Sequence, residues 1–109
     1  METGRYGCAT EFTMELLKGK WTVVILARVK QGPQRYADLR AALEVSDKML
    51  TTRLEDLQAR DLLTLDDERR YVLTERGQSL REVLQTIYDW GLREAERTGV
   101  QLATHQTVR

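Results

Sequence analysis

The chain has 109 residues, with 17 acidic and 17 basic side chains and a hydrophobic fraction of 41%. This length fits one compact domain, and the composition is that of a globular chain rather than a disordered one. The longest apolar run, residues 23–27, is far shorter than a membrane span, and the first residues lack a signal-peptide pattern, so we expect a soluble, cytoplasmic domain without a membrane partner.

The charges are unevenly distributed. Residues 18–60 hold nine Lys or Arg against five Asp or Glu, a local charge of +4, and residues 61–75 hold two against five, a local charge of −3. The positive excess fits a local nucleic-acid footprint, although chance can also produce it.

The N-terminal third is predicted to be an arm followed by two helices. Residues 1–9 form the flexible arm, which contains the only cysteine, Cys8. Thr10 is suited to cap a short helix that ends at Gly19. The apolar residues 20–30 predict a buried helix, because the segment is long for a strand and stops at the turn residues 32–33. Residues 34–35 are predicted to add a short strand.

Residues 36–60 predict two helices joined by a very short break. Ser46 follows the break and is a good N-cap for the second helix. Leu50, Leu54 and Leu57 recur at helical spacing and form its inward face. This order is the helix-turn-helix pattern, whose second helix enters a DNA groove. An ordinary helical hairpin with a solvated outer face would fit the same residues.

Residues 62–74 predict two short strands around an acidic turn. Leu63 and Leu65 alternate on the first strand, and Tyr71 and Leu73 alternate on the second. A hairpin after a helix-turn-helix is the winged arrangement. The predicted fold class is therefore mainly α with a small β-hairpin wing, in a single domain spanning residues 1–109.

Residues 75–98 predict one long helix capped by Thr74, followed by a frayed tail over residues 99–109. Its apolar stripe is too large for a small winged-helix core to cover, and such stripes usually mark interfaces. We expect a homodimer through the N- and C-terminal helices, although the long helix could instead fold back onto its own chain. The expected interface residues are Phe12, Leu16, Leu80, Leu84, Ile87 and Trp90.

With these parts in order, the sequence resembles the HxlR-type family of bacterial winged-helix transcription regulators, relatives of the MarR group. The resemblance covers about residues 8–92. It rests on Gly19-Lys20-Trp21, Ile25-Leu26, Gly32, Arg35-Tyr36, Leu39, Ser46, Lys48-Met49-Leu50-Thr51, Arg53-Leu54, Leu57, Tyr71, Leu73-Thr74, Gly77 and Trp90-Gly91.

The resemblance implies a dimeric, sequence-specific DNA-binding regulator, most often a repressor, that binds double-stranded DNA at a pseudo-palindromic operator. Cys8 lies where this family often has a cysteine, several of them redox- or electrophile-reactive, so it is a sensor candidate. The expected groove-facing residues are Ser46, Lys48, Thr51 and Thr52, with Arg53 shared between phosphate contact and helix packing. The expected backbone contacts are Arg35, Lys20, Arg69 and Arg70.

The sequence departs from the family pattern at three places. Ala9 follows the cysteine where the family usually has proline, and Asp61-Leu62 stands where it usually has Gly-Leu. The wing is short and lacks the common proline. Only Arg69 and Arg70 therefore remain as expected wing contacts.

A winged-helix protein-interaction module that never touches DNA is the alternative function, favoured by the zero net charge and the acidic wing tip. An enzyme is not expected, because the folded part has no histidine, no glycine-rich phosphate loop and no nucleophile–base set. With one cysteine and one histidine, His105 in the tail, neither a metal site nor a cofactor is expected. The sequence leaves a small-molecule effector open.

Overall fold

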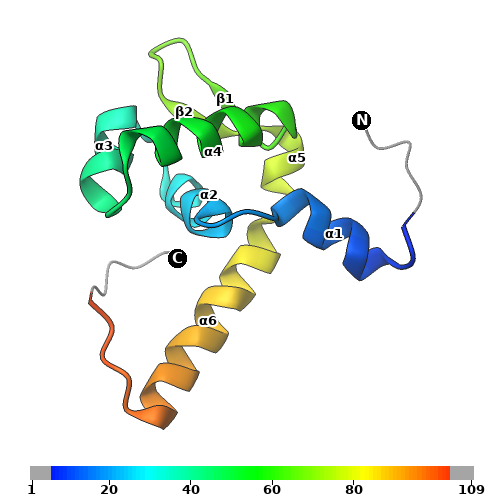
Figure 1. The fold of residues 1–109 in the computed structure, drawn as a ribbon, viewed down its shortest axis with the longest axis vertical. Helices are drawn as coiled ribbons and strands as arrows, with labels where there is room; N and C mark the ends of the chain where they lie inside the picture. The colour runs from blue at the N-terminus through cyan, green and yellow to red at the C-terminus, as the bar shows by residue number, and fades with distance from the viewer. Residues whose placement is uncertain (1–5, 104–109) are drawn as a thin grey trace.

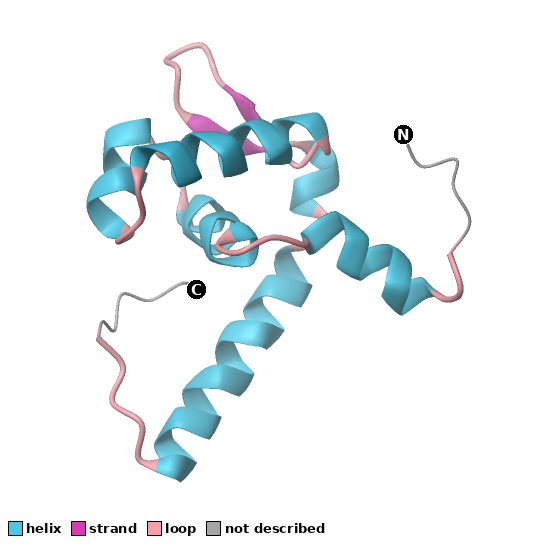
Figure 2. Ribbon diagram, viewed as in Figure 1, coloured by secondary structure: helices cyan, strands magenta, loops and turns pink. Residues whose placement is uncertain are grey.

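The computed structural model describes residues 6–103 (Figure 1). In this range the chain is mainly helical, with one two-stranded antiparallel hairpin (Figure 2), as predicted for a winged helix-turn-helix. The elements in chain order are α1 (Ala9–Leu17), α2 (Thr22–Gln31), α3 (Tyr36–Ala42), α4 (Asp47–Ala59), β1 (Leu63–Leu65), β2 (Tyr71–Leu73), α5 (Glu75–Gln78) and α6 (Arg81–Thr98).

The central body contains α2 to α5 and the hairpin, and α1 and α6 project from it in different directions (Figure 1). The Cα radius of gyration is 14.5 Å, above the ~13 Å of a compact domain of this length. A projecting helix has fewer neighbours to cover its apolar residues. The two terminal helices are therefore the elements whose surfaces need further explanation.

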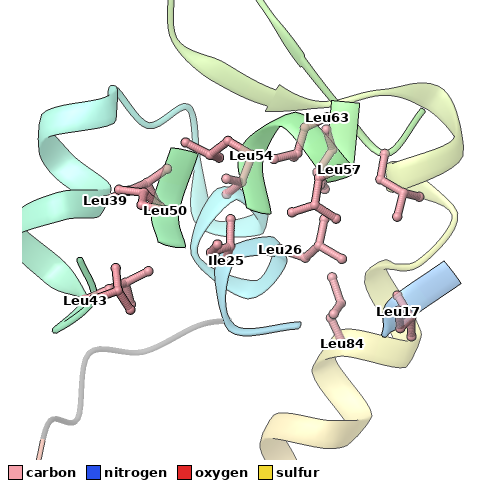
Figure 3. Close-up of a cluster of buried hydrophobic side chains, with 14 residues drawn as sticks. Leu17, Ile25, Leu26, Leu39, Leu43, Leu50, Leu54, Leu57, Leu63 and Leu84 are labelled. Atoms are coloured by element: carbon pink, nitrogen blue, oxygen red, sulfur yellow. The ribbon is translucent and has the colours of Figure 1, made fainter. Parts of the chain in front are cut away.

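Leucines from every layer of the body meet in one core (Figure 3). Ile25 and Leu26 of α2 are fully buried against the inward face of α4. Leu63 and Leu73 pair across the hairpin and close the core from the other side. The core therefore fixes α4 through one face only and leaves its opposite face at the surface. The buried apolar cluster comprises Leu17, Ile25, Leu26, Val29, Leu39, Leu43, Val45, Leu50, Leu54, Leu57, Leu62, Leu63, Leu73 and Leu84.

The hairpin also binds the loop before α3. Gln34 and Tyr71 exchange two backbone hydrogen bonds, with N···O distances of 3.1 and 2.7 Å. The strand predicted over residues 34–35 is thus a single bridge. It goes no further because Pro33 has no N–H to donate and α3 begins at Tyr36.

The single helix predicted over residues 75–98 is wrong, because the structure has two helices there. Thr74 does cap the first, since its Oγ1 accepts from the Gly77 N–H at 3.0 Å. After α5 the chain tightens: the Leu80 N–H bonds to the Gly77 carbonyl, and Leu80 lies at φ −91°, ψ 0°. Gly77 is needed here, because a Cβ would collide with the Leu62 carbonyl and the Leu73 side chain.

Polar contacts tie the start of α6 to the end of α2. Lys30, which is buried, donates from Nζ to Gln85 Oε1 at 2.7 Å. Arg81 Nη1 donates to the Lys30 carbonyl at 3.2 Å, and Gln85 in turn donates to Asp89. These bonds fix the direction in which α6 leaves the body.

The termini differ from prediction in detail. Helix α1 begins at Ala9 with Cys8 as its N-cap residue, two residues earlier than a Thr10 cap would allow. Gly99 ends α6 in the left-handed conformation, a common helix stop. Residues 1–5 of the predicted arm and 104–109 of the predicted tail, including His105, lie outside the described residues.

Candidate nucleic-acid interface

Helix α4 presents a polar outer face. The Ser46 hydroxyl accepts from the Met49 N–H at 3.0 Å and so starts the helix, as predicted. Lys48, Thr51 and Thr52 are exposed on the side away from the leucine core. Within the described residues, the side chains of Lys48 and Thr52 make no hydrogen bond, so their polar atoms are available to a ligand.

A second polar group forms where the two helices of the motif begin. The Tyr36 hydroxyl donates to Asp47 Oδ1 at 2.9 Å, and Arg40 Nε donates to the same oxygen at 2.8 Å. These two hydrogen bonds, with that of Arg40 the stronger cause, lower the pKa of Asp47 and keep its carboxylate ionised. Sequence reasoning missed this group, and the turn length between α3 and α4 is the signal that could have revealed it.

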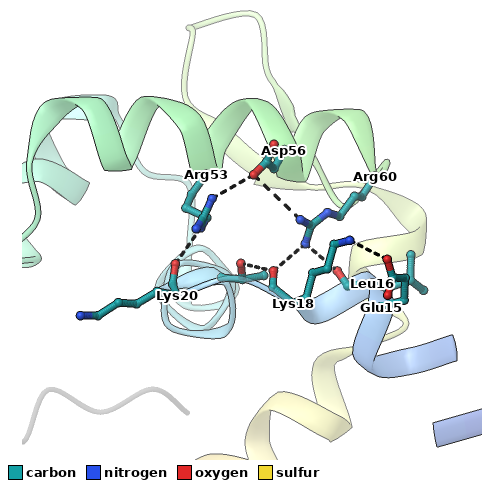
Figure 4. A network of polar contacts seen from close by, with 8 residues as sticks. Glu15, Leu16, Lys18, Lys20, Arg53, Asp56 and Arg60 are labelled. Atoms are coloured by element: carbon teal, nitrogen blue, oxygen red, sulfur yellow. Dashed lines mark hydrogen bonds and ion pairs between the residues drawn. The ribbon is translucent and has the colours of Figure 1, made fainter. Parts of the chain in front are cut away.

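Arg53 has the helix-packing role that was predicted for it beside a phosphate contact. Its Nε donates to the Lys20 carbonyl at 2.8 Å, and its Nη1 pairs with Asp56 at 3.1 Å (Figure 4). Only 19% of the side chain is exposed. Arg53 therefore fastens α4 to the linker between α1 and α2, whereas the Lys20 side chain stays exposed.

Arg60 fastens the other end of α4 to the same linker (Figure 4). Its Nη1 donates to the carbonyls of Leu16 and Lys18, at 3.0 and 2.9 Å. The linker needs unusual backbone: Gly19 lies at φ 106° and Trp21 at φ 77°. Arg53 of α4 and Arg60 at its end thus stabilise the linker between α1 and α2. Sequence patterns do not reveal this contact.

The wing is held together by its own charges. Asp66 accepts from the backbone N–H groups of Glu68 and Arg70, both at 2.9 Å, and from Arg70 Nε. The backbone hydrogen bond from Arg70 is the main cause that lowers the pKa of Asp66. Arg70 also pairs with Glu68, so its charge is already matched.

Two further predicted phosphate contacts, Arg35 and Arg69, lie beside Glu68 of the wing. Arg35 Nη1 donates to the Glu68 carbonyl at 2.8 Å, which joins α3 to the wing. Arg69 is exposed and lies at φ 61°, with no ion pair or hydrogen bond from its side chain among the described residues. Arg69 is therefore the wing cation best placed to meet a phosphate.

The α6 surface divides into a buried side and an exposed side. Leu84 is only 2% exposed and packs in the core of its own chain, so its predicted place in a dimer interface is wrong. Leu80 also packs against that core. Ile87 and Trp90 are exposed, Trp90 by 59%, together with Val83. The bonds of Gln85 and Arg81 to Lys30 hold this part of α6 against α2, which fits the burial of Leu84.

Phe12 and Leu16, the predicted interface residues of α1, are half-buried. They line a cavity of about 250 Å³ with Arg60 and Arg76. Cys8 lies at the exposed start of the same helix, and the backbone amides of Glu11 and then Thr10 lower the pKa of its thiol.

Two negative findings concern residues 6–103. No group of three or more His, Cys, Asp or Glu side chains in this range is arranged to hold a metal ion. None of its helices combines the length and apolar character that a membrane crossing requires.

Several known proteins are similar to this chain in both sequence and fold. The chain is 31% identical over 104 residues to YtcD of Bacillus subtilis, an HTH-type transcriptional regulator, covering 89% of this chain and 82% of YtcD. A YtcD crystal structure superposes with a TM-score of 0.71 and 30% identity, covering 82% of this chain and 98% of that one.

Two further structures carry chemical information in their names. The redox regulator HypR, in its oxidised form, matches with a TM-score of 0.66 and 26% identity, covering 79% of this chain and 96% of that one. Quinone-bound YodB from B. subtilis matches with a TM-score of 0.65 and 28% identity, covering 77% of this chain and 96% of that one. The family model described as HxlR-like helix-turn-helix matches residues 16–98. This chain, with its two-helix motif, wing and terminal helices, therefore belongs to the HxlR-like helix-turn-helix family.

Proposed function

We propose that this helix-turn-helix protein is a transcriptional regulator that acts as a homodimer, binds a specific DNA sequence and represses the genes beside it. The observation that carries the proposal is the outer face of α4. Lys48, Thr51 and Thr52 are exposed there while the opposite leucines are buried. Long cations and small hydroxyls are side chains that reach phosphates and base edges in a major groove.

Cations placed around this face support phosphate binding. Lys20 lies on the linker that Arg53 fastens to α4, and Arg69 lies at the wing tip. Phosphate contacts supply affinity and register, whereas the short α4 face supplies sequence preference. A net charge of zero for the chain is compatible with this arrangement, because the segment 18–60 that holds α4 and Lys20 carries a local charge of +4.

The exposed apolar side of α6 supports the dimer. Val83, Ile87 and Trp90 stand on a helix that projects from the body (Figure 1). A stable interface buries about 1,200–2,000 Å² in total, and a symmetric pair of such helices is the commonest way to cover an apolar face. In the dimer, two α4 helices would meet half-sites about one helical turn apart, ~34 Å.

The test is equilibrium binding of the protein to genomic fragments and to random duplexes at two salt concentrations. We expect one class of fragments to bind at least ~10³-fold more tightly than random DNA at equal salt. Equal affinity for every fragment would overturn sequence-specific regulation. Footprints on the bound fragments should show two related half-sites.

The acidic wing tip favours a second candidate, a protein-interaction module. Asp66, Asp67 and Glu68 form that tip, and Asp66 is ionised. Carboxylates repel phosphates, so this surface would suit a basic protein partner. No binding to any duplex at low salt, where phosphate contacts are strongest, would favour this candidate.

We further propose that Cys8 makes the regulator responsive to oxidants or electrophiles. The names of HypR, a redox regulator, and of quinone-bound YodB associate relatives of this fold with such signals. Cys8 is exposed, its pKa is lowered, and it starts the α1 helix proposed for the interface. The cavity beside Phe12 would be the place for a small-molecule effector.

A further inference from the structure

Helix α4 carries a carboxylate at the end expected to enter the groove. Asp47 is its first residue, and 72% of the Asp47 side chain is exposed. A carboxylate near DNA is repelled by the phosphates, so it lowers non-specific affinity. It also accepts hydrogen bonds and cannot donate them. An acid at this position therefore restricts which base edges the helix tip can meet.

The side chain of Asp47 is held in place by α3. Tyr36 and Arg40 both donate to Oδ1, at 2.9 and 2.8 Å. Among the hydrogen bonds of the described residues, none ends on Asp47 Oδ2. One oxygen therefore fixes the carboxylate and the other is open to a donor. Arg40 matches the charge of Asp47, which reduces the repulsion that phosphates would exert on it.

Only some bases offer a donor in the major groove. Guanine presents two acceptors there, and thymine presents an acceptor and a methyl group. Adenine presents its N6 amino group beside the N7 acceptor, which would repel a carboxylate. Cytosine presents its N4 amino group with an acceptor on one side only, the O6 of the paired guanine, whereas adenine N6 lies between N7 and the O4 of the paired thymine. A fixed carboxylate oxygen thus matches cytosine best.

We propose that Asp47 recognises a cytosine in each operator half-site, with Tyr36 and Arg40 as its positioning residues. The proposal rests on the sequence-specific DNA binding proposed above and adds one base to it. The free oxygen of Asp47 accepts from the cytosine N4 amino group. Tyr36 and Arg40 hold the carboxylate at the angle this contact needs.

The test is selection of bound sequences from a pool of random duplexes, followed by competition binding of the enriched sites. The wild type is expected to enrich half-sites with cytosine at one fixed position. Asp47→Ala should lose about tenfold of preference at that position, the usual scale of one base contact. Asp47→Asn should shift the preference to adenine, because an amide pairs with adenine N6 and N7.

Glu55→Gln is the matched control, since Glu55 is another exposed acid of α4 and the charge change is the same. It should leave all base preferences unchanged. Tyr36→Phe keeps the ring but removes the donor, so it should weaken the cytosine preference without shifting it to another base. This last result separates positioning from a general loss of stability, which would lower binding to all sequences together.

Each outcome is decisive. If the wild type enriches no sequence, the proposed specific DNA binding fails, and the Asp47 proposal fails with it. If the wild type enriches a site and both Asp47 variants enrich it with the same base at every position, only the Asp47 proposal is overturned. The same holds if the variants bind every sequence more tightly with unchanged preferences, because Asp47 would then act through charge alone.

Discussion

Cys8 combines three residue-level properties that bear on regulation. It is exposed, it is the only cysteine of the chain, and the amides of Glu11 and Thr10 lower the pKa of its thiol. A lowered pKa means a larger thiolate fraction at neutral pH, and the thiolate is the reactive form. Oxidation could give a Cys8–Cys8 link across a dimer, a mixed disulfide or a sulfenic acid.

We predict that diamide or a quinone releases the wild type from DNA and leaves the Cys8→Ser variant bound. The reason is that modification at the start of α1 would change the seating of that helix and the spacing of the two α4 helices. DNA-binding titrations with and without the reagent measure this. Equal release of both proteins, or of neither, would make Cys8 a structural residue.

At the scale of elements, α4 carries both residues proposed to bind DNA and residues that hold the helix in the fold. Arg53→Ala should lower the free energy of unfolding by roughly 1–2 kcal/mol, because it removes charged hydrogen bonds to the Lys20 carbonyl and to Asp56. Lys48→Ala should leave stability within ~0.5 kcal/mol and weaken specific DNA binding by about 1–3 kcal/mol. Urea unfolding and binding titrations of both variants measure the two effects. Unchanged unfolding free energy together with weakened DNA binding in Arg53→Ala would instead indicate that Arg53 contacts DNA.

The two arginines of the wing are also expected to differ in their roles. Arg69→Ala should reduce affinity for all sequences and lower the slope of log affinity against log salt by about one, as expected for one lost phosphate contact. Arg70→Ala is the control, because Asp66 and Glu68 already match its charge. Its slope should equal that of the wild type. Identical slopes for all three proteins would show that the wing does not touch the backbone of the DNA.

The features that could be predicted from the sequence depend on interactions between residues close together in the chain. Leu50, Leu54 and Leu57 repeat within one helix, so their inward face was predictable from spacing, and the structure buries all three. Ser46 and Thr74 cap helices through bonds three residues away, which is equally local. These elements account for the correct winged helix-turn-helix order.

Sequence patterns did not reveal the contacts that join distant parts of the chain. Arg53 bonds to Lys20, 33 residues earlier, and no local pattern announces such a partner. The close fit of Gly77 of α5 against Leu62 and Leu73 is another such contact, which a helical periodicity cannot reveal. Spacing alone puts Leu84 on the interface stripe, whereas Leu84 packs in the core of its own chain.

At the scale of the whole molecule, the direction of α6 decides how two copies could meet. Lys30, Arg81 and Gln85 fix the start of α6 against α2, so the helix leaves the body at a set angle. Two copies joined along α6 would then hold their α4 helices at a set separation. In the proposed dimer, these contacts would link the geometry of the interface to the spacing of the operator half-sites.

We predict that Trp90→Glu converts a dimer into a monomer. A charge placed on a side chain that is 59% exposed in the single chain costs little in the monomer, whereas burying it unpaired in an interface costs several kcal/mol. Light scattering at micromolar concentration should therefore give twice the chain mass for the wild type and one chain mass for the variant. Ala41→Glu, an exposed position of α3 away from α6 (Figure 1), should remain dimeric.

The monomeric variant also tests whether assembly and DNA recognition are coupled. A single α4 reaches one half-site, so Trp90→Glu should lose most of its preference for the intact operator while keeping its circular dichroism spectrum. Affinity for an isolated half-site should be similar for both proteins, because the α4 face is unchanged. A wild type that is already monomeric at micromolar concentration would end the dimer proposal. The exposed side of α6 would then need another partner, and the acidic wing tip would make the protein-interaction module the stronger reading.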